Sequence, residues 1–220
     1  MHRQPRLSQI RNETVNESER LREELAQKIA GYIVDHGLDW TSARARAAED
    51  FGDRRILRSN VMPSSEQIET AVRAHFDLFA PEAHRRTLHL KRTLALHILK
   101  LLKGFSAYLT GAVLNGAATE DSPVCIEVFT DDIKAILSVL MDEGFDIEAL
   151  DPASSAFARA TESVGFIIAW QQIPQIVRID ILEPQQRFHN PARRNHDIYQ
   201  AEWEASGRIS IENLQKVIEN

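Results

Sequence analysis

Residues 108–129 read YLTGAVLNGAATEDSPVCIEVF, and the rest of the chain is organised around them. The apolar residues Tyr108 and Leu109 precede Gly111, a run of small residues predicts a turn, and an apolar pattern resumes at Val124. This order predicts a strand, a glycine turn, a short helix and a second strand. It places the Gly111 turn beside the start of the second strand, where backbone N–H groups can meet a phosphate. The alternative is a strand–helix–strand corner whose glycines serve packing alone.

The spacing of small residues in this stretch resembles the nucleotidyltransferase superfamily, the polymerase-β-like fold. That superfamily carries Gly-Ser, a short helix, and then Ser-Asp-hydrophobic-Asp-hydrophobic. Gly111 takes the place of the glycine, and Ala112 that of the first serine. Asn115-Gly116 falls on the usual Arg-Gly, and Ser122 on the serine before the first carboxylate. The resemblance covers roughly residues 20–215, and the flanking segments resemble a smaller bacterial family in which this motif is often eroded.

The two metal-binding carboxylates of the superfamily are replaced here by Pro123 and Cys125. Proline offers no ligand atom, and Mg²⁺ prefers oxygen to a thiol. The resemblance implies an α+β fold: a nucleotidyltransferase-like mixed β-sheet flanked by helices, with an N-terminal helical extension. It also implies Mg²⁺ and a nucleoside triphosphate as cofactors. The nucleotide-binding residues that it implies are Gly111, Ala112, Asn115, Gly116 and Ser122.

The superfamily takes a third metal ligand from a later strand, where this chain offers Asp180 as the catalytic and metal-binding candidate. Strand alternation places Asp180 on a polar face with Arg178, so the alternative is an ion pair between the two. Glu127 is the second catalytic candidate because it shares a strand face with residues 123 and 125; its alternative is a solvent-facing side chain. A relocated site would combine Glu127 and Asp180 with Asp121 or Glu120, although two-metal geometry tolerates errors of only about 0.5 Å.

Composition limits the class of protein. The chain has 220 residues, 43% of them hydrophobic, which suffices for one ordinary domain and a helical extension. No apolar run reaches the ~18 residues of a membrane span, and no apolar segment follows the first charges as in a secretory signal. Cys125 is the single cysteine and cannot form an internal disulfide, which indicates the cytoplasm.

Charge is unevenly distributed. Residues 105–183 hold 3 Lys and Arg against 13 Asp and Glu, whereas residues 1–60 hold 11 against 10. Because nucleic-acid binding relies on clustered cations, we do not expect it through this acidic core. The N-terminal arginines form either a basic patch for nucleic acid or acidic protein, or a solvated helix face balanced by acids. They are Arg44, Arg46, Arg54, Arg55 and Arg58.

Periodicity predicts a flexible tail over residues 1–17, an N-terminal helical hairpin and linker over 18–63, and a nucleotidyltransferase-like domain over 64–220. Helices are predicted over Ser18–Gly37 and Thr41–Phe51, from a Ser64/Gln67 capping box, over Pro81–Gly104, after Asp131-Asp132, and from Ser210. Strands are predicted over Tyr108–Gly111, Val124–Phe129, Phe145–Leu150, Val164–Trp170 and Ile176–Leu182. We expect the first two strands and the last to lie side by side in one mixed sheet.

Three functions remain open. The favoured hypothesis is a nucleotidyltransferase-like protein with degenerate metal-binding acids that binds nucleotide or acts in regulation or interaction. The second is an active metal-dependent nucleotidyltransferase that moves a nucleoside monophosphate onto a protein, RNA or small molecule. The third is a structural protein whose helices form a homo-oligomer interface.

Overall fold

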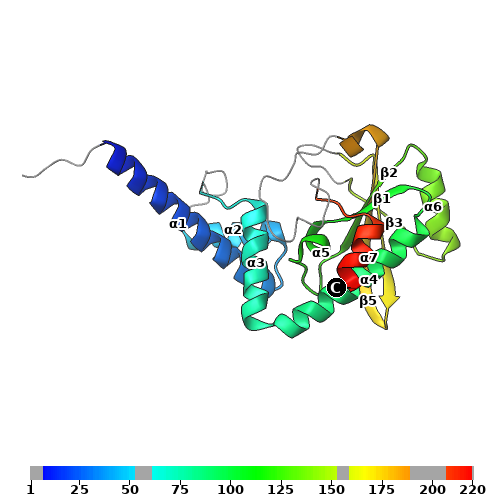
Figure 1. Ribbon diagram of the computed structural model, residues 1–220, viewed down its shortest axis with the longest axis horizontal. Helices are drawn as coiled ribbons and strands as arrows, with labels where there is room; N and C mark the ends of the chain where they lie inside the picture. Colours follow the sequence, from blue (N-terminus) through cyan, green and yellow to red (C-terminus); the bar gives the residue numbers. More distant parts are fainter. Residues whose placement is uncertain (1–6, 53–60, 153–158, 189–206, 220) are drawn as a thin grey trace, which may run out of the picture. The chain divides into compact units, whose positions relative to one another are not determined.

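The computed structural model describes residues 7–52, 61–152, 159–188 and 207–219 (Figure 1). The chain divides into two compact units, Met1–His84 and Arg85–Asn220. Within the described ranges, no helix combines the length and the apolar composition needed to cross a membrane.

The first unit is built from α1 (Leu7–Val34), α2 (Trp40–Asp50) and α3 (Ser65–Phe79). Apolar residues at helical spacing form its core, and the alanines of α2 let that helix lie close to α1. Local sequence fixes the helix starts: Asp39 caps α2, and Ser64 with Gln67 makes the predicted capping box of α3. The buried core residues include Leu25, Ile29, Ile33, Ala43, Ala47, Ile68 and Val72.

Helix α1 begins at Leu7 and not at Ser18, so it includes residues 7–17 of the predicted tail; residues 1–6 lie outside the described residues. Residues 7–17 are mostly polar and lack a regular apolar stripe, which is why periodicity did not reveal them. They contain neither proline nor glycine, and the nearest helix-breaking residue on the N-terminal side is Pro5. No proline or glycine therefore interrupts the helix over residues 7–17.

The division of the chain also differs from the predicted boundary at residue 64. Helix α3 belongs to the first unit, since its buried face, which includes Ile68 and Val72, is part of the helical core there. Helix α4 (Pro81–Leu101) begins in the first unit and continues through the second.

The second unit holds a five-stranded mixed sheet in the order β1-β2-β5-β4-β3. Its strands are β1 (Ser106–Thr110), β2 (Val124–Phe129), β3 (Glu148–Leu150), β4 (Glu162–Trp170) and β5 (Ile173–Leu182). Strands β2 and β5 are parallel and the other pairs are antiparallel. The α+β class and the neighbourhood of the three motif-bearing strands are thus confirmed.

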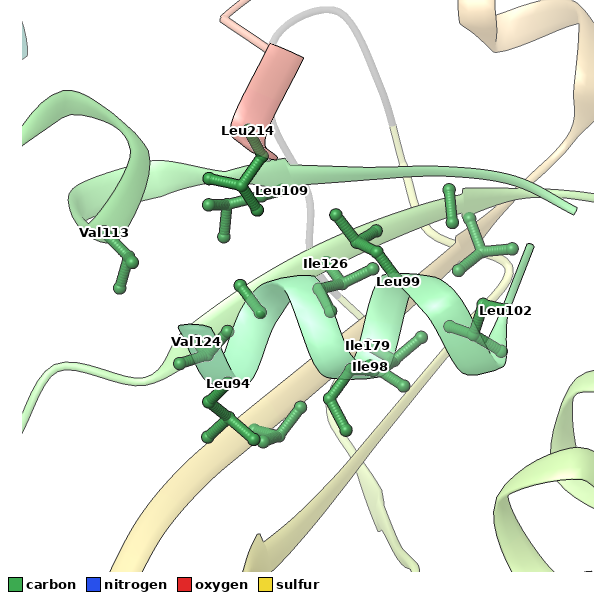
Figure 2. Close-up of a cluster of buried hydrophobic side chains, with 14 of the residues drawn as sticks. Leu94, Ile98, Leu99, Leu102, Leu109, Val113, Val124, Ile126, Ile179 and Leu214 are labelled. Carbon is green, nitrogen blue, oxygen red and sulfur yellow. The ribbon is translucent and has the colours of Figure 1, made fainter. Parts of the chain in front are cut away.

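Alternation along the strands gives this sheet two different faces. One face packs against the second half of α4, where Leu94 and Ile98 lie with Ile126 and Ile179 in one buried cluster (Figure 2). Leu214 joins the same cluster from α7 (Ile211–Glu219). The remaining helices are α5 (Gly111–Asn115), α6 (Ile133–Asp142), which Asp132 caps as predicted, and the 3₁₀ helix η2 (Pro184–Phe188).

Candidate functional site

The Gly111 turn joins β1 directly to α5. Gly111 has φ +69°, and Gly116 ends α5 with φ +82°. Both values lie in the left-handed region that favours glycine. A Cβ on Gly111 would meet Cys125 at an ordinary 3.8 Å, so backbone conformation and not lack of space calls for glycine there. The predicted strand–glycine–helix–strand order is therefore present, with Ala112 half-buried in the first turn of α5.

The loop from α5 to β2 is held by its own hydrogen bonds. The side-chain oxygen of buried Asn115 accepts from the Ala117 amide at 3.0 Å. The Ser122 hydroxyl accepts from the Thr119 amide at 2.9 Å and lies 3.1 Å from the Thr119 hydroxyl. Two of the predicted nucleotide-binding side chains, Asn115 and Ser122, thus take part in shaping the loop.

The second face of the sheet, opposite α4, brings the candidate acids together. Parallel pairing of β2 with β5 sets Cys125 opposite Arg178 and Glu127 opposite Asp180. Glu127 and Asp180 are therefore neighbours on adjacent strands. Ser163 on β4 extends the same row, because it pairs with Asp180 on the other side.

Asp180 is engaged by two neighbours on this face. It is only 9% exposed, and its Oδ1 accepts from Arg178 Nε at 2.9 Å and from the Ser163 hydroxyl. Arg178 also donates to the Asp151 carbonyl oxygen at 2.7 Å. The ion pair that we weighed against metal binding is therefore present in the fold.

Glu127 is engaged by an arginine that the sequence analysis missed. Arg208 donates from Nε to Glu127 Oε2, and its side chain is 3% exposed against 24% for the glutamate. The guanidinium also lies 4.4 Å from the centre of the Phe129 ring and donates to the Arg187 carbonyl oxygen at 3.2 Å. This corrects the alternative of a solvent-facing Glu127. No local pattern links two residues that lie 81 positions apart.

Cys125 is poorly suited to bind a metal or to act as a nucleophile. Burial, followed by the negative charge of Asp180, raises the pKa of its thiol to about 11.

Among the residues that the structure describes, no three His, Cys, Asp or Glu side chains are grouped as ligands of one metal ion. The relocated set of Glu127, Asp180 and Asp121 or Glu120 is thus not brought together.

The N-terminal arginines within the described residues have local partners. Arg44 donates to the Ser65 hydroxyl, and Arg46 lies 3.8 Å from Glu49. The Arg46 contact fits a helix face balanced by acids, whereas Arg44 binds a neutral hydroxyl at the start of α3. The remaining predicted members, Arg54, Arg55 and Arg58, lie outside the described residues.

Comparison of the chain with protein-family models, with curated proteins and with solved structures found no match.

Proposed function

We propose that this chain is a nucleotidyltransferase-like protein with degenerate metal-binding acids, which binds nucleotide or serves in regulation or interaction and does not transfer nucleotides. The observation that carries the proposal is the charge balance on the second face of the sheet. Each of the two remaining carboxylates has its own guanidinium partner: Arg178 for Asp180 and Arg208 for Glu127.

Two-metal catalysis needs carboxylates whose charge is available to divalent cations. A guanidinium at hydrogen-bond distance already supplies one positive charge and occupies acceptor positions that a cation would use. Pro123 and Cys125 contribute no oxygen ligand from their side chains. The active enzyme, our second hypothesis, would have to break both ion pairs and still lack two of the three expected acids.

Support for nucleotide binding comes from the backbone of the Gly111 turn. Thr110 precedes α5 without a side-chain cap hydrogen bond, so the first amides of the helix are not capped by that side chain. The glycine turn is the part of the motif that would offer backbone N–H groups to phosphate oxygens. We expect weak, metal-independent binding, because Asp121 and Glu120 on the neighbouring loop repel an anion.

The test is an NMR titration with ATP at millimolar concentration, without and with Mg²⁺. We expect chemical-shift changes at residues 110–112 that do not require Mg²⁺, and no transfer of labelled nucleotide in parallel incubations. Gly111→Ala should abolish the shifts. Gly144→Ala is the matched control, since Gly144 also has positive φ (+81°) and lies just after the C-cap of α6. Unperturbed amides at 110–112 would exclude nucleotide binding, and transfer that depends on Asp180 would favour the enzyme.

A further inference from the structure

Helix α4 contacts the loop between β1 and β2 through two consecutive cationic residues. Lys91 Nζ donates to the Ser122 carbonyl oxygen at 2.7 Å and to Gln175 Oε1 at 2.9 Å. Arg92 donates to the carbonyl oxygens of Val113 and Leu114, both at 3.2 Å. Lys91 therefore binds the end of the loop, just before β2, and Arg92 binds its beginning, at α5.

Burial of the Lys91 ammonium costs desolvation free energy. Its side chain is 1% exposed, although lysine is almost never fully buried without a charged partner. Both of its hydrogen-bond acceptors are neutral, and burial lowers the pKa of its ammonium while Asp121 and Glu120 oppose that shift. Burying an ammonium is unfavourable unless hydrogen bonds compensate for its lost solvation, so Lys91 depends on these two contacts.

The two acceptors of Lys91 mark equivalent positions in the sheet. Val124 pairs with Val177 at the start of the parallel β2–β5 ladder. Ser122 and Gln175 each lie two residues before their member of that pair. The Gln175 amide is oriented by a second bond, from Nε2 to the Pro174 carbonyl oxygen at 2.9 Å. Lys91 thus links the end of the β1–β2 loop to β5, two residues before the first pair of the ladder.

Arg92 completes the arrangement at the other end. Val113 and Leu114 lie near the end of α5, a helix of five residues whose last carbonyls have few partners inside the helix. The guanidinium supplies donors to two of them, while Ala117 returns a backbone bond to Ala112 at 3.0 Å. A helix this short is marginal by itself, so contacts from α4 add stability where it is most needed.

We infer that Lys91 and Arg92 form a two-point clamp by which α4 fixes the β1–β2 loop and sets the register of β2 against β5. Register matters because a slip of one residue would move every side chain of β2 to the other face. The clamp would then determine that Glu127 lies opposite Asp180. This inference goes beyond the proposed function and does not depend on nucleotide binding.

Amide hydrogen exchange of the whole chain tests the clamp. Lys91→Met should speed exchange at Thr119, Ser122 and the first residues of β2 by about tenfold or more, with little change in β4. Lys100→Met, an exposed position on the same helix, is the matched control and should change nothing. Wild-type exchange at Ser122 in Lys91→Met would overturn the inference.

A second variant covers failure of Lys91→Met to fold. Replacing both partners by apolar groups can be nearly neutral for stability, so Lys91→Met/Gln175→Met should restore folding. The Ser122 loop should still exchange rapidly in it, and wild-type protection there would also overturn the clamp. Arg92→Met should act at the other end, on the Ala117 amide, and Arg92→Lys should recover part of that protection. If neither Arg92 variant changes hydrogen exchange at the Ala117 amide, Arg92 is not part of the clamp.

Discussion

Glu127 lies opposite Asp180 in the parallel pairing of β2 with β5, and each carboxylate is already bound by an arginine. In the nucleotidyltransferase superfamily, to which our proposal relates this chain, carboxylates on the corresponding strands hold metal ions. Here Arg178 and Arg208 provide positive charge from within the fold. The arrangement places two neighbouring acids on one sheet face and pairs each with a guanidinium, which leaves little net negative charge there to attract Mg²⁺.

Removing the Arg208 guanidinium should leave the partly buried Glu127 carboxylate without its ion-pair partner. We expect Arg208→Gln to lower the free energy of unfolding by about 3 kcal/mol, the usual cost of breaking a largely buried pair. Urea denaturation checks this, with Arg187→Gln as control, since Arg187 is exposed and lies over the Tyr108 ring. Adding Glu127→Gln to Arg208→Gln should recover part of the loss. Equal midpoints for Arg208→Gln and the control would show that the pair contributes nothing.

Cys125 should be nearly inert toward thiol reagents in the native protein. The nucleophile is the thiolate, and a pKa raised from 9.0 to about 11 leaves roughly 100-fold less of it at pH 8. Because the chain has one cysteine, the reaction with a disulfide reagent reports on it alone. The rate should rise steadily as pH approaches 11, and the denatured chain should react fully at pH 8. Rapid native reaction at pH 8 would contradict the raised pKa of the Cys125 thiol.

Lys91 should make stability increase with pH in the alkaline range. Its pKa is lowered from 10.5 in the folded protein, so the unfolded chain binds more protons between the lowered pKa and 10.5. The free energy of unfolding therefore rises with pH through this window and is lowest below the folded pKa. Urea denaturation of wild type and Lys91→Met at pH 8 and pH 10 isolates this contribution. A wild-type advantage that shrinks on going to pH 10 would reverse the assigned sign.

Local signals made much of this fold predictable. The Ser64/Gln67 capping box, the Asp132 cap and the glycines at 111 and 116 act over a few residues, and each is found where the sequence placed it. The neighbourhood of β1, β2 and β5 came from the spacing of one motif. The prediction of helices relied on apolar periodicity, which residues 7–17 lack, so it missed the start of α1 at Leu7.

The partners of the candidate acids could not be predicted in the same way. Arg178 was found because it is two residues from Asp180 on the same strand face, whereas Arg208 reaches Glu127 across 81 positions. Lys91 did carry a usable signal, since it precedes Leu94 and Ile98 at helical spacing and so belongs to the apolar face of α4. A lysine on such a face predicts a buried polar contact, but not with which loop.

Restoring the missing acids tests the central claim, that the superfamily's architecture is retained and its ligands are lost. Pro123→Asp with Cys125→Asp would place two carboxylates on the sheet face that carries Asp180. Pro123 precedes β2, so its replacement removes no ladder hydrogen bond. Burying a carboxylate at position 125 should be destabilising without a cation, and a bound cation stabilises the folded state by mass action.

The decisive measurement is therefore the melting temperature of this double variant with and without Mg²⁺. The neutral pair Pro123→Asn with Cys125→Asn serves as control. We predict that the acidic variant melts below wild type in the absence of metal and recovers by several degrees when Mg²⁺ is added, while the neutral variant does not respond. Equal melting of the acidic variant with and without Mg²⁺ would contradict the account.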